Sequence, residues 1–210
     1  MPRVNSVDKA RKSPGQCGKC GKAIPKGRPY IHWKFRYGGK RIRCASCPRP
    51  RQSELTNSDK LSRCYGAAEA IEDAIAQFHK DYDEEGLRTA MEDAANEIQE
   101  VAGEYRDSAS NVESGMNGNR MPICDELEEK ADTLESKASD LESAAAEIEE
   151  FDEDQAKEEA ENEAREEMGD EAKGDDFDKK VEEILQGKKD DWADEQASKA
   201  EEFTDLSPEG

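Results

Sequence analysis

The sequence has few of the residues that form a large hydrophobic core or a catalytic centre. Hydrophobic residues make up 33% of its 210 residues and aromatic residues 6%, whereas 40% are charged. Histidine occurs only as His32 and His79, and we find neither a phosphate-binding glycine loop nor a nucleophile elbow. One large core is therefore not expected, and we predict that the protein is not an enzyme.

Long apolar runs are also missing. No stretch approaches the roughly 20 apolar residues that cross a bilayer. The opening MPRVNSVDKARKSPGQ carries charge without an apolar segment behind it. We expect no membrane contact and a cytoplasmic location. Because cytoplasmic thiols stay reduced, the six cysteines indicate a metal site instead of disulfides.

Acidic residues are nearly absent from the start of the chain and dominate the rest. Residues 1–64 contain 17 Lys and Arg against 3 Asp and Glu, whereas residues 65–210 contain 14 against 49. Such asymmetry indicates that the first part contacts polyanions and that the second repels them, solvates the chain or imitates them.

Four cysteines form two C-x2-C pairs that are separated by 23 residues: Cys17 with Cys20, and Cys44 with Cys47. Two intervening residues let one tight turn present both sulfurs to a single ion, and Zn²⁺ takes four thiolates in a tetrahedron. We predict one structural zinc ion bound by all four. Two unrelated pairs, or a disulfide-bonded fold, are the alternatives. Four protein ligands leave no open position for catalysis.

The segment between the pairs has the pattern of a β-hairpin. In residues 30–37 apolar and aromatic side chains alternate with polar ones, which predicts a strand. Gly38 and Gly39 predict a two-residue turn, and residues 40–44 the returning strand.

Basic residues follow this predicted hairpin and could neutralise the phosphates of DNA or RNA. The candidate nucleic-acid contacts are Lys34, Arg36, Lys40, Arg41, Arg43 and the aromatic Tyr37. Trp33 and Tyr37 could stack on bases. Alternatively, Trp33 and Phe35 form the core, because so small a domain has little else to bury. An acidic protein surface competes with nucleic acid as the ligand of the basic residues.

Three stretches, SVDKARKSPGQCGKCGKAIPKG, WKFRYGGKRIRC and PRPRQSELT, resemble the N-terminal zinc module of a family of uncharacterised proteins encoded by tailed bacteriophages. The resemblance covers roughly the first 60 residues, and the combination is more specific than the cysteines alone. It implies a phage origin and a bacterial cytoplasmic setting, and it supplies no catalytic residues.

Prolines at 48 and 50 end the cysteine-rich module, and a helical region follows. Thr56, Asn57 or Ser58 can cap a first helix, whose apolar residues recur every three or four positions up to Phe78. A second amphipathic helix begins near Glu84.

The third helix has heptad spacing. Its two seams consist of Leu127, Leu134, Leu141 and Ile148 on one side and Cys124, Ala131, Ala138 and Ala145 on the other. Alanine on one seam allows close helix approach, and short connectors imply antiparallel neighbours. We therefore predict an antiparallel coiled coil or three-helix bundle, with Cys64 and Cys124 as core residues.

The last segment is strongly acidic. Residues 152–178 contain 14 acidic and 3 basic side chains, which predicts a solvated helix or disorder. Two short amphipathic helices separated by Gly187 are expected beyond it. Trp192 and Phe203 are candidate partner-binding anchors, although terminal helices also dock on their own bundle.

These patterns divide the chain into a basic zinc-ribbon-like β module (1–52), an acidic all-α antiparallel bundle (53–151) and an acidic extension (152–210). The predicted function is that of a non-enzymatic zinc-binding phage protein. Its module would bind DNA or RNA, and its acidic helices would bind a host or phage protein. The alternative is a DNA mimic or adaptor that inhibits a host nucleic-acid-processing or defence complex.

Overall fold

The computed structural model describes residues 1–36, 38–116, 121–169 and 174–208. These residues form two compact units, Met1–Gly66 and Ala67–Gly210. The first contains a small antiparallel sheet and the four clustered cysteines, and the second is helical. The boundaries predicted from composition fall at residues 52 and 151.

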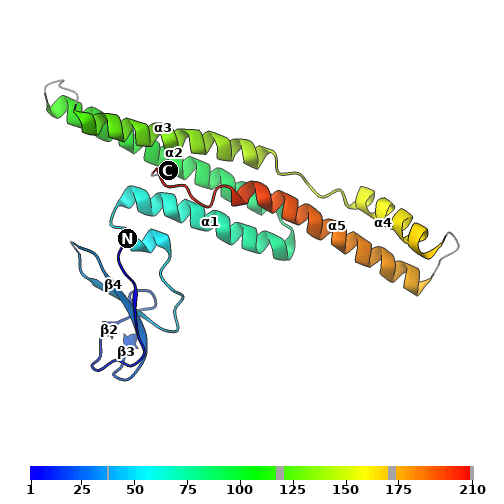
Figure 1. Cartoon of the computed structure of the whole chain (residues 1–210), viewed down its shortest axis with the longest axis horizontal. Helices are drawn as coiled ribbons and strands as arrows, with labels where there is room; N and C mark the ends of the chain where they lie inside the picture. The colour runs from blue at the N-terminus through cyan, green and yellow to red at the C-terminus, as the bar shows by residue number, and fades with distance from the viewer. Residues whose placement is uncertain (37, 117–120, 170–173, 209–210) are drawn as a thin grey trace. The chain divides into compact units, whose positions relative to one another are not determined.

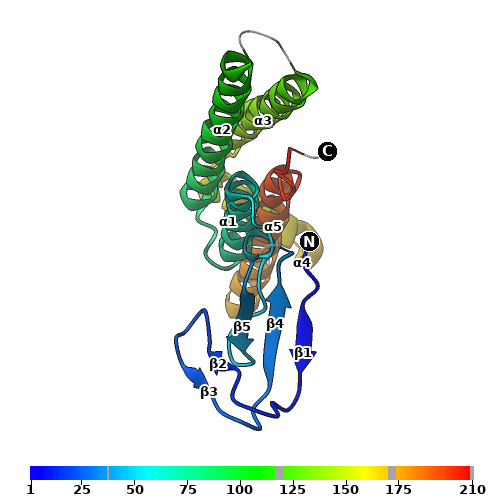
Figure 2. The ribbon, with the colours of Figure 1, turned by 90° about the vertical axis from the view of Figure 1, so that its left-hand side faces the viewer.

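In the part of the first unit that the structure describes, there are five short strands (Figure 2). They are β1 (Asn5–Val7), β2 (Gly15–Gln16), β3 (Ala23–Ile24), β4 (Tyr30–Lys34) and β5 (Lys40–Cys44). Strands β1, β4 and β5 form a three-stranded antiparallel sheet in that order, and β2 pairs with β3. The β4–β5 register joins Tyr30 to Cys44 and Lys34 to Lys40.

The alternation in β4 confirms that one face of the sheet is the core. Ile31, Trp33 and Phe35 are buried, whereas Lys34 and Arg36 are exposed. Trp33 and Phe35 therefore belong to the core, as the small size of the unit suggested. Strand β1 was not predicted, because its three residues take their extended form from pairing with β4 and carry no apolar pattern of their own.

The predicted hairpin turn was wrong. Strand β4 ends at Lys34 instead of residue 37, and residues 35–39 connect it to β5. A turn closes directly after the strand, where the backbone N–H of Gly38 donates to the carbonyl of Phe35 at 3.4 Å. The chain therefore leaves the sheet after Lys34. The candidate contact residue Tyr37 lies outside the described residues.

Within the described residues, five α-helices follow a short 3₁₀ helix, η1 (Gln52–Leu55). They are α1 (Asp59–Asp81), α2 (Glu84–Gly115), α3 (Pro122–Ala146), α4 (Glu153–Met168) and α5 (Asp175–Glu201). Side-chain caps fix three of the starts: Ser58 accepts a hydrogen bond from the N–H of Leu61, Asp83 from that of Gly86, and Asp152 from that of Gln155. No helix in the described part of the chain is long and apolar enough to cross a membrane.

Helices α2 and α3 lie side by side and antiparallel (Figure 1). Near one end the Cys124 sulfur contacts the carbonyl of Ala109, and near the other Arg88 donates to the carbonyl of Ile148 at 2.8 Å. Most of the predicted heptad positions are buried, namely Cys124, Ala131, Leu134, Ala138, Leu141 and Ala145, with Ile148 just beyond the helix. Leu127 is half-buried.

The predicted bundle of three helices is incomplete, because a further helix packs against it. This helix, α5, is long and passes through Gly187 without a break. Its first half packs against α4 through Val181, Ala160 and Ala164. Its second half meets the end of α3, where Gln196 accepts a hydrogen bond from the N–H of Glu149 at 3.0 Å. The two short helices expected from the sequence are thus one, because tertiary contacts on both sides outweigh the low helix propensity of a single glycine.

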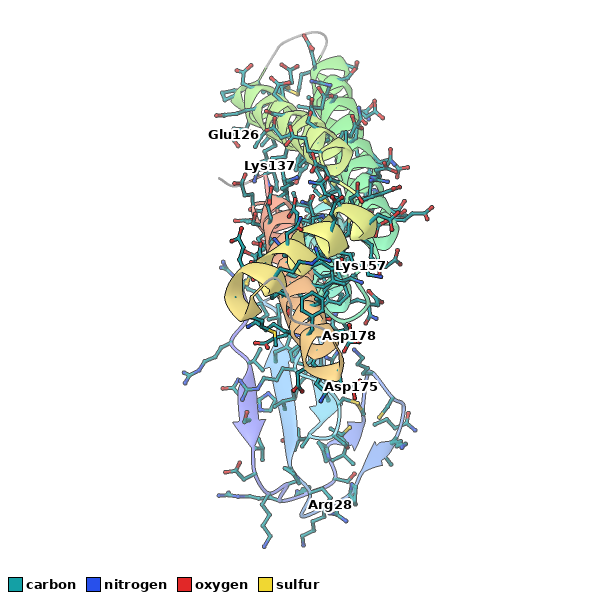
Figure 3. All side chains as sticks on the ribbon, turned by 90° about the vertical axis from the view of Figure 1, so that its right-hand side faces the viewer. Arg28, Glu126, Lys137, Lys157, Asp175 and Asp178 are labelled. Carbon is teal, nitrogen blue, oxygen red and sulfur yellow. The ribbon has the colours of Figure 1, made fainter. Side chains whose placement is uncertain are left out.

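The outer surfaces of the helices carry many carboxylates (Figure 3). Asp175 and Asp178, labelled in the figure, lie in the first turn of α5, where the helix dipole favours negative charge. Two of the cations pair with carboxylates of a neighbouring helix: Arg106 of α2 with Asp132 and Glu135 of α3, and Lys188 of α5 with Glu159 and Glu163 of α4.

The two candidate partner anchors lie within the helical unit. The Trp192 ring is half-buried between Phe78 of α1 and Phe151, with centroid distances of 5.4 and 5.3 Å. Phe203, just after α5, is half-buried too. The segment beyond it is held by Lys137, which donates to the carbonyls of Asp205 and Ser207 at 3.1 and 2.8 Å. The terminal helix is therefore docked on its own bundle, which was the alternative to a role in partner binding.

Replacement of Leu134 by alanine tests the α2–α3 interface. Leu134 is fully buried, so the shorter side chain leaves a cavity and should lower the free energy of unfolding by about 2–5 kcal/mol. Thermal unfolding followed by far-ultraviolet circular dichroism measures the change. Ser136→Ala, at an exposed position of the same helix, is the matched control. Equal stability of the two variants would contradict the packing.

Candidate metal centre

Two tight turns bring the four cysteines together. The first follows β2, and the backbone N–H of Gly21 donates to the carbonyl of Cys17 at 2.9 Å. Gly21 has a φ of +69°, a conformation that favours glycine. The second follows β5, and the N–H of Cys47 donates to the carbonyl of Cys44 at 3.2 Å. A further bond, from the N–H of Gly18 to the carbonyl of Ile42 at 2.8 Å, ties the first turn to β5.

The sulfur positions match a tetrahedral thiolate site. All four sulfurs lie within 4.8 Å of one another. The Cys17–Cys47, Cys20–Cys44 and Cys44–Cys47 sulfur distances are 3.8, 3.7 and 3.4 Å. Four thiolates at about 2.3 Å from a central zinc ion would lie about 3.8 Å apart, whereas a disulfide needs about 2.05 Å. The cysteines are free thiols, so the alternatives of disulfides and of two unrelated pairs are both wrong.

Local hydrogen bonds prepare some of these thiols to ionise. Burial by itself would raise the pKa of Cys17, but hydrogen bonds from the backbone of Cys20, Cys44 and Lys19 lower it to about 6. The Ser46 hydroxyl, 3.4 Å from the Cys44 sulfur, lowers the pKa of Cys44. Hydrogen bonding to Cys44 raises the pKa of Cys47 to about 12. Because metal binding releases the thiol protons, affinity should fall as the pH decreases.

The donor set limits the metals that the site could hold. Four sulfurs in a compact tetrahedral arrangement suit Zn²⁺ or iron and do not suit Mg²⁺ or Ca²⁺, which take oxygen ligands. Among the described residues, no other group of three or more potential metal ligands converges in this way. All four positions of a tetrahedron are filled by the protein, which is the arrangement of a structural site.

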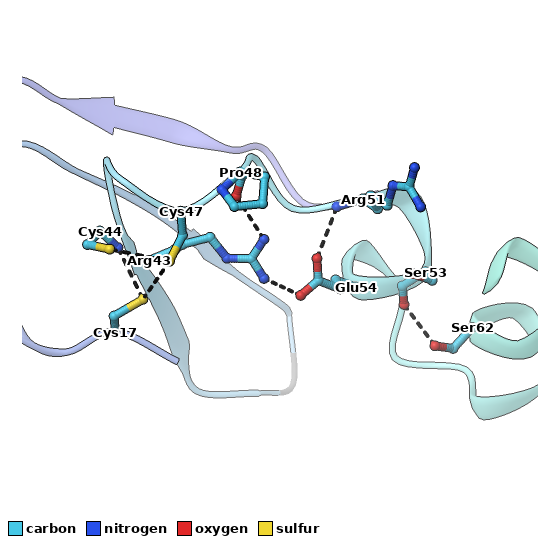
Figure 4. Close-up of polar contacts among 9 residues, drawn as sticks. All are labelled: Cys17, Arg43, Cys44, Cys47, Pro48, Arg51, Ser53, Glu54 and Ser62. Carbon is cyan, nitrogen blue, oxygen red and sulfur yellow. Dashed lines mark hydrogen bonds and ion pairs between the residues drawn. The ribbon is translucent and has the colours of Figure 1, made fainter. Parts of the chain in front are cut away.

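Arg43 anchors the chain next to the metal ligands (Figure 4). Its side chain is 3% exposed. The guanidinium donates to the carbonyl of Pro48 at 3.0 Å, forms an ion pair with Glu54 and lies 5.6 Å from the centroid of the Trp33 ring. Glu54 also accepts a hydrogen bond from the N–H of Arg51 at 3.1 Å. The contacts join β5 to the segment that follows the second cysteine turn.

The assignment of Arg43 to the nucleic-acid contacts is therefore wrong. The β4–β5 register pairs Arg43 with Ile31 on the buried face of the sheet, so its charge is not available to phosphates. Glu54, one of three acidic residues in the first 64, is the partner that the sequence analysis missed. Burial would raise the pKa of Glu54, but the hydrogen bond from Arg43 lowers it.

The remaining basic residues of the hairpin do not form one stripe. Lys34, Arg36, Lys40 and Arg41 are all exposed. Lys34 and Lys40 are paired across the strands, whereas Arg41 pairs with Trp33 and therefore lies on the opposite face. There the Arg41 guanidinium lies 5.0 Å from the centroid of the Phe35 ring. The hairpin thus carries positive charge on both faces.

Metal analysis of the purified protein tests the site. We expect one zinc ion per chain, and loss of the ion in Cys17→Ser, because the sulfur of Cys17 is the buried member of the cluster. Removing the ion with a chelator should unfold the first unit, since binding contributes on the order of 10 kcal/mol to folding in small zinc modules. Cys124→Ala, which changes a cysteine of the helical unit, should keep the metal. A wild-type protein without stoichiometric metal would contradict the assignment.

Substitution of Arg43 tests the anchor. Arg43→Met should lower the free energy of unfolding of the first unit by about 1–3 kcal/mol, because the Pro48 carbonyl and the Glu54 carboxylate lose their partner. Arg43→Lys should recover only part of the loss, since an ammonium cannot reproduce the fork of the guanidinium. Thermal unfolding of the zinc-loaded proteins measures both. The control Arg49→Met, at an exposed position, should be as stable as the wild type. Wild-type stability of Arg43→Met would show that Arg43 does not anchor the chain.

Comparisons with models of protein families, with curated proteins and with solved structures found no match to this chain. The features of the chain that bear on its function are the four converging sulfurs, the exposed cations of the sheet and the acidic helices.

Proposed function

We propose that this protein is a non-enzymatic zinc protein that binds nucleic acid through its first unit and a protein partner through its acidic helices. The observation that carries the proposal is the four-sulfur cluster in a unit that is rich in exposed cations. A structural ion there would hold the sheet together and leave its surface free for a ligand. No residue is assigned a catalytic role.

Zinc is the proposed ion, because the sulfur distances of 3.4–3.8 Å agree with four thiolates around Zn²⁺. Free cysteines suit a reducing compartment, and a bacterial cytoplasm is the proposed location. A phage origin, suggested by the resemblance of the first 60 or so residues to phage zinc modules, is part of the same proposal.

Nucleic acid is the proposed ligand of the first unit because of charge. Residues 1–64 contain 17 basic and 3 acidic side chains, and Lys34, Lys40 and Arg41 are exposed. Neutralisation of phosphates by such cations gives affinity that depends on salt and hardly on sequence. The acidic unit, with 49 acidic against 14 basic residues, would weaken non-specific binding by repelling the same phosphates.

The acidic charge also supports a second function. Carboxylates spaced along rigid helices could occupy the nucleic-acid site of a basic host or phage protein, as a DNA mimic or adaptor would. In that case the helical unit would bind the partner, and the charges of the sheet would matter little. Affinity purification from bacteria that express the protein, with and without nuclease treatment, separates the two functions: a basic partner that is retained after nuclease supports mimicry.

Charge reversal on the sheet tests nucleic-acid binding. The triple variant Lys34→Glu, Lys40→Glu, Arg41→Glu should abolish binding of the full chain to a labelled oligonucleotide at low salt, because it replaces three phosphate contacts with repulsion. For the wild type, the logarithm of the affinity should fall linearly with the logarithm of the salt concentration. Fluorescence anisotropy measures both.

A matched control reverses three charges elsewhere in the same unit, at Lys9, Lys12 and Lys26, which are all exposed. This variant should bind more weakly than the wild type but still detectably. Absence of binding by the wild type at low salt would remove the nucleic-acid proposal and favour the mimic. Unchanged metal content shows that each variant is folded.

A further inference from the structure

We propose that one face of the three-stranded sheet binds a single strand of DNA or RNA by stacking its bases on Tyr30 and His32. The inference rests on the proposed nucleic-acid function and adds the surface and the form of the ligand. Of the two stacking candidates suggested by the sequence, Trp33 lies in the core and Tyr37 lies outside the described residues.

The strand register defines this face. Residues that pair across antiparallel strands point to the same side, and the pairs are Tyr30 with Cys44, His32 with Ile42, and Lys34 with Lys40. Strand β1 adds Val7 opposite Tyr30 and Asn5 opposite His32. We call these eight residues the Tyr30 face: Asn5, Val7, Tyr30, His32, Lys34, Lys40, Ile42 and the cluster cysteine Cys44.

The Tyr30 face is the accessible side of the sheet. Tyr30, His32 and Ile42 are half-buried, and Lys34 and Lys40 are exposed, whereas Ile31 and Trp33 on the other side are buried. The rings of Tyr30 and His32 are adjacent, with centroids 5.7 Å apart and an interplanar angle of 31°. Two aromatic rings on neighbouring positions of an open sheet form a platform on which successive unpaired bases can stack.

Positive charge borders the platform. The Lys40 ammonium lies 5.3 Å from the centroid of the Tyr30 ring, and Lys34 is directly across the strands from Lys40. None of the eight residues that define the face is an aspartate or a glutamate. Burial and the charge of Lys40 lower the pKa of His32, so its ring is neutral near pH 7 and stacks as an uncharged aromatic. A phosphate backbone that passes beside the rings would meet both lysines.

Unpaired bases fit this arrangement better than a duplex or an acidic protein. A duplex hides the faces of its bases and offers only phosphates and groove edges. An acidic polypeptide satisfies the lysines but leaves the two half-buried rings without a flat partner. A single strand supplies both groups, because each nucleotide carries one phosphate and one aromatic face. The rings would therefore distinguish single strands from duplexes, whereas the lysines would not.

Binding by the full chain at low salt tests this inference by fluorescence anisotropy. The probes are a labelled oligothymidylate, an oligouridylate of the same length and a mixed-sequence duplex. The first two should bind more tightly than the duplex, and their comparison distinguishes DNA from RNA. Tyr30→Leu and His32→Leu should each lower single-strand affinity roughly tenfold and leave duplex affinity unchanged. Tyr30→Phe keeps the ring and should bind like the wild type.

Each outcome has a distinct meaning. Absence of binding to all three probes overturns the proposed function and this inference with it. Any of three results overturns the stacking surface alone. They are equal affinity for single strands and duplex, wild-type single-strand affinity of Tyr30→Leu, and equally good competition by polyglutamate. If the leucine variants lose their metal, ultraviolet cross-linking of the wild type to oligothymidylate gives the answer: the label should lie on the β4 peptide, and a label confined to other peptides refutes the assignment.

Discussion

Convergence of four cysteine sulfurs is the constraint on which the first unit depends. The strands there are two to five residues long, and few large apolar side chains are buried among them. So small a core cannot by itself offset the conformational entropy lost on folding. The two cysteine turns join β2 to the end of β5, and Arg43 extends this link to Pro48 and Glu54. A metal ion, which the four sulfurs could hold, and a buried guanidinium would thus take the place of a larger core.

The helical unit is stabilised in a different way. Its interfaces use alanine heavily, at Ala131, Ala138 and Ala145 of α3 and at Ala160 and Ala164 of α4. Small side chains let the helix backbones approach closely, so van der Waals contacts form along the interface without bulky residues. The scarce cations then neutralise carboxylates between neighbouring helices. This leaves a surface that is strongly negative, in keeping with either repulsion of nucleic acid or its imitation.

The two faces of the sheet show how one basic hairpin can hold residues with different roles. Arg43 and Trp33 face the interior, and Lys34, Lys40, Tyr30 and His32 face the opposite side. A list of basic and aromatic residues does not separate them, because a side chain acts on a ligand only if the sheet leaves it accessible. The period of two along a strand separates the faces, but which face is covered depends on the segment after β5.

The sequence alone determined the cysteine cluster, the alternation in β4, the start of α2 near Glu84 and the buried seam of α3, because each of these follows from local spacing. It did not determine that Arg43 pairs with Glu54, or that α5 continues through Gly187 to place Trp192 beside Phe78. Those features depend on which distant segments supply the contacts. Burial of Arg43 and packing on both halves of α5 are tertiary interactions that outweigh local preference, and only the folded chain brings the partners together.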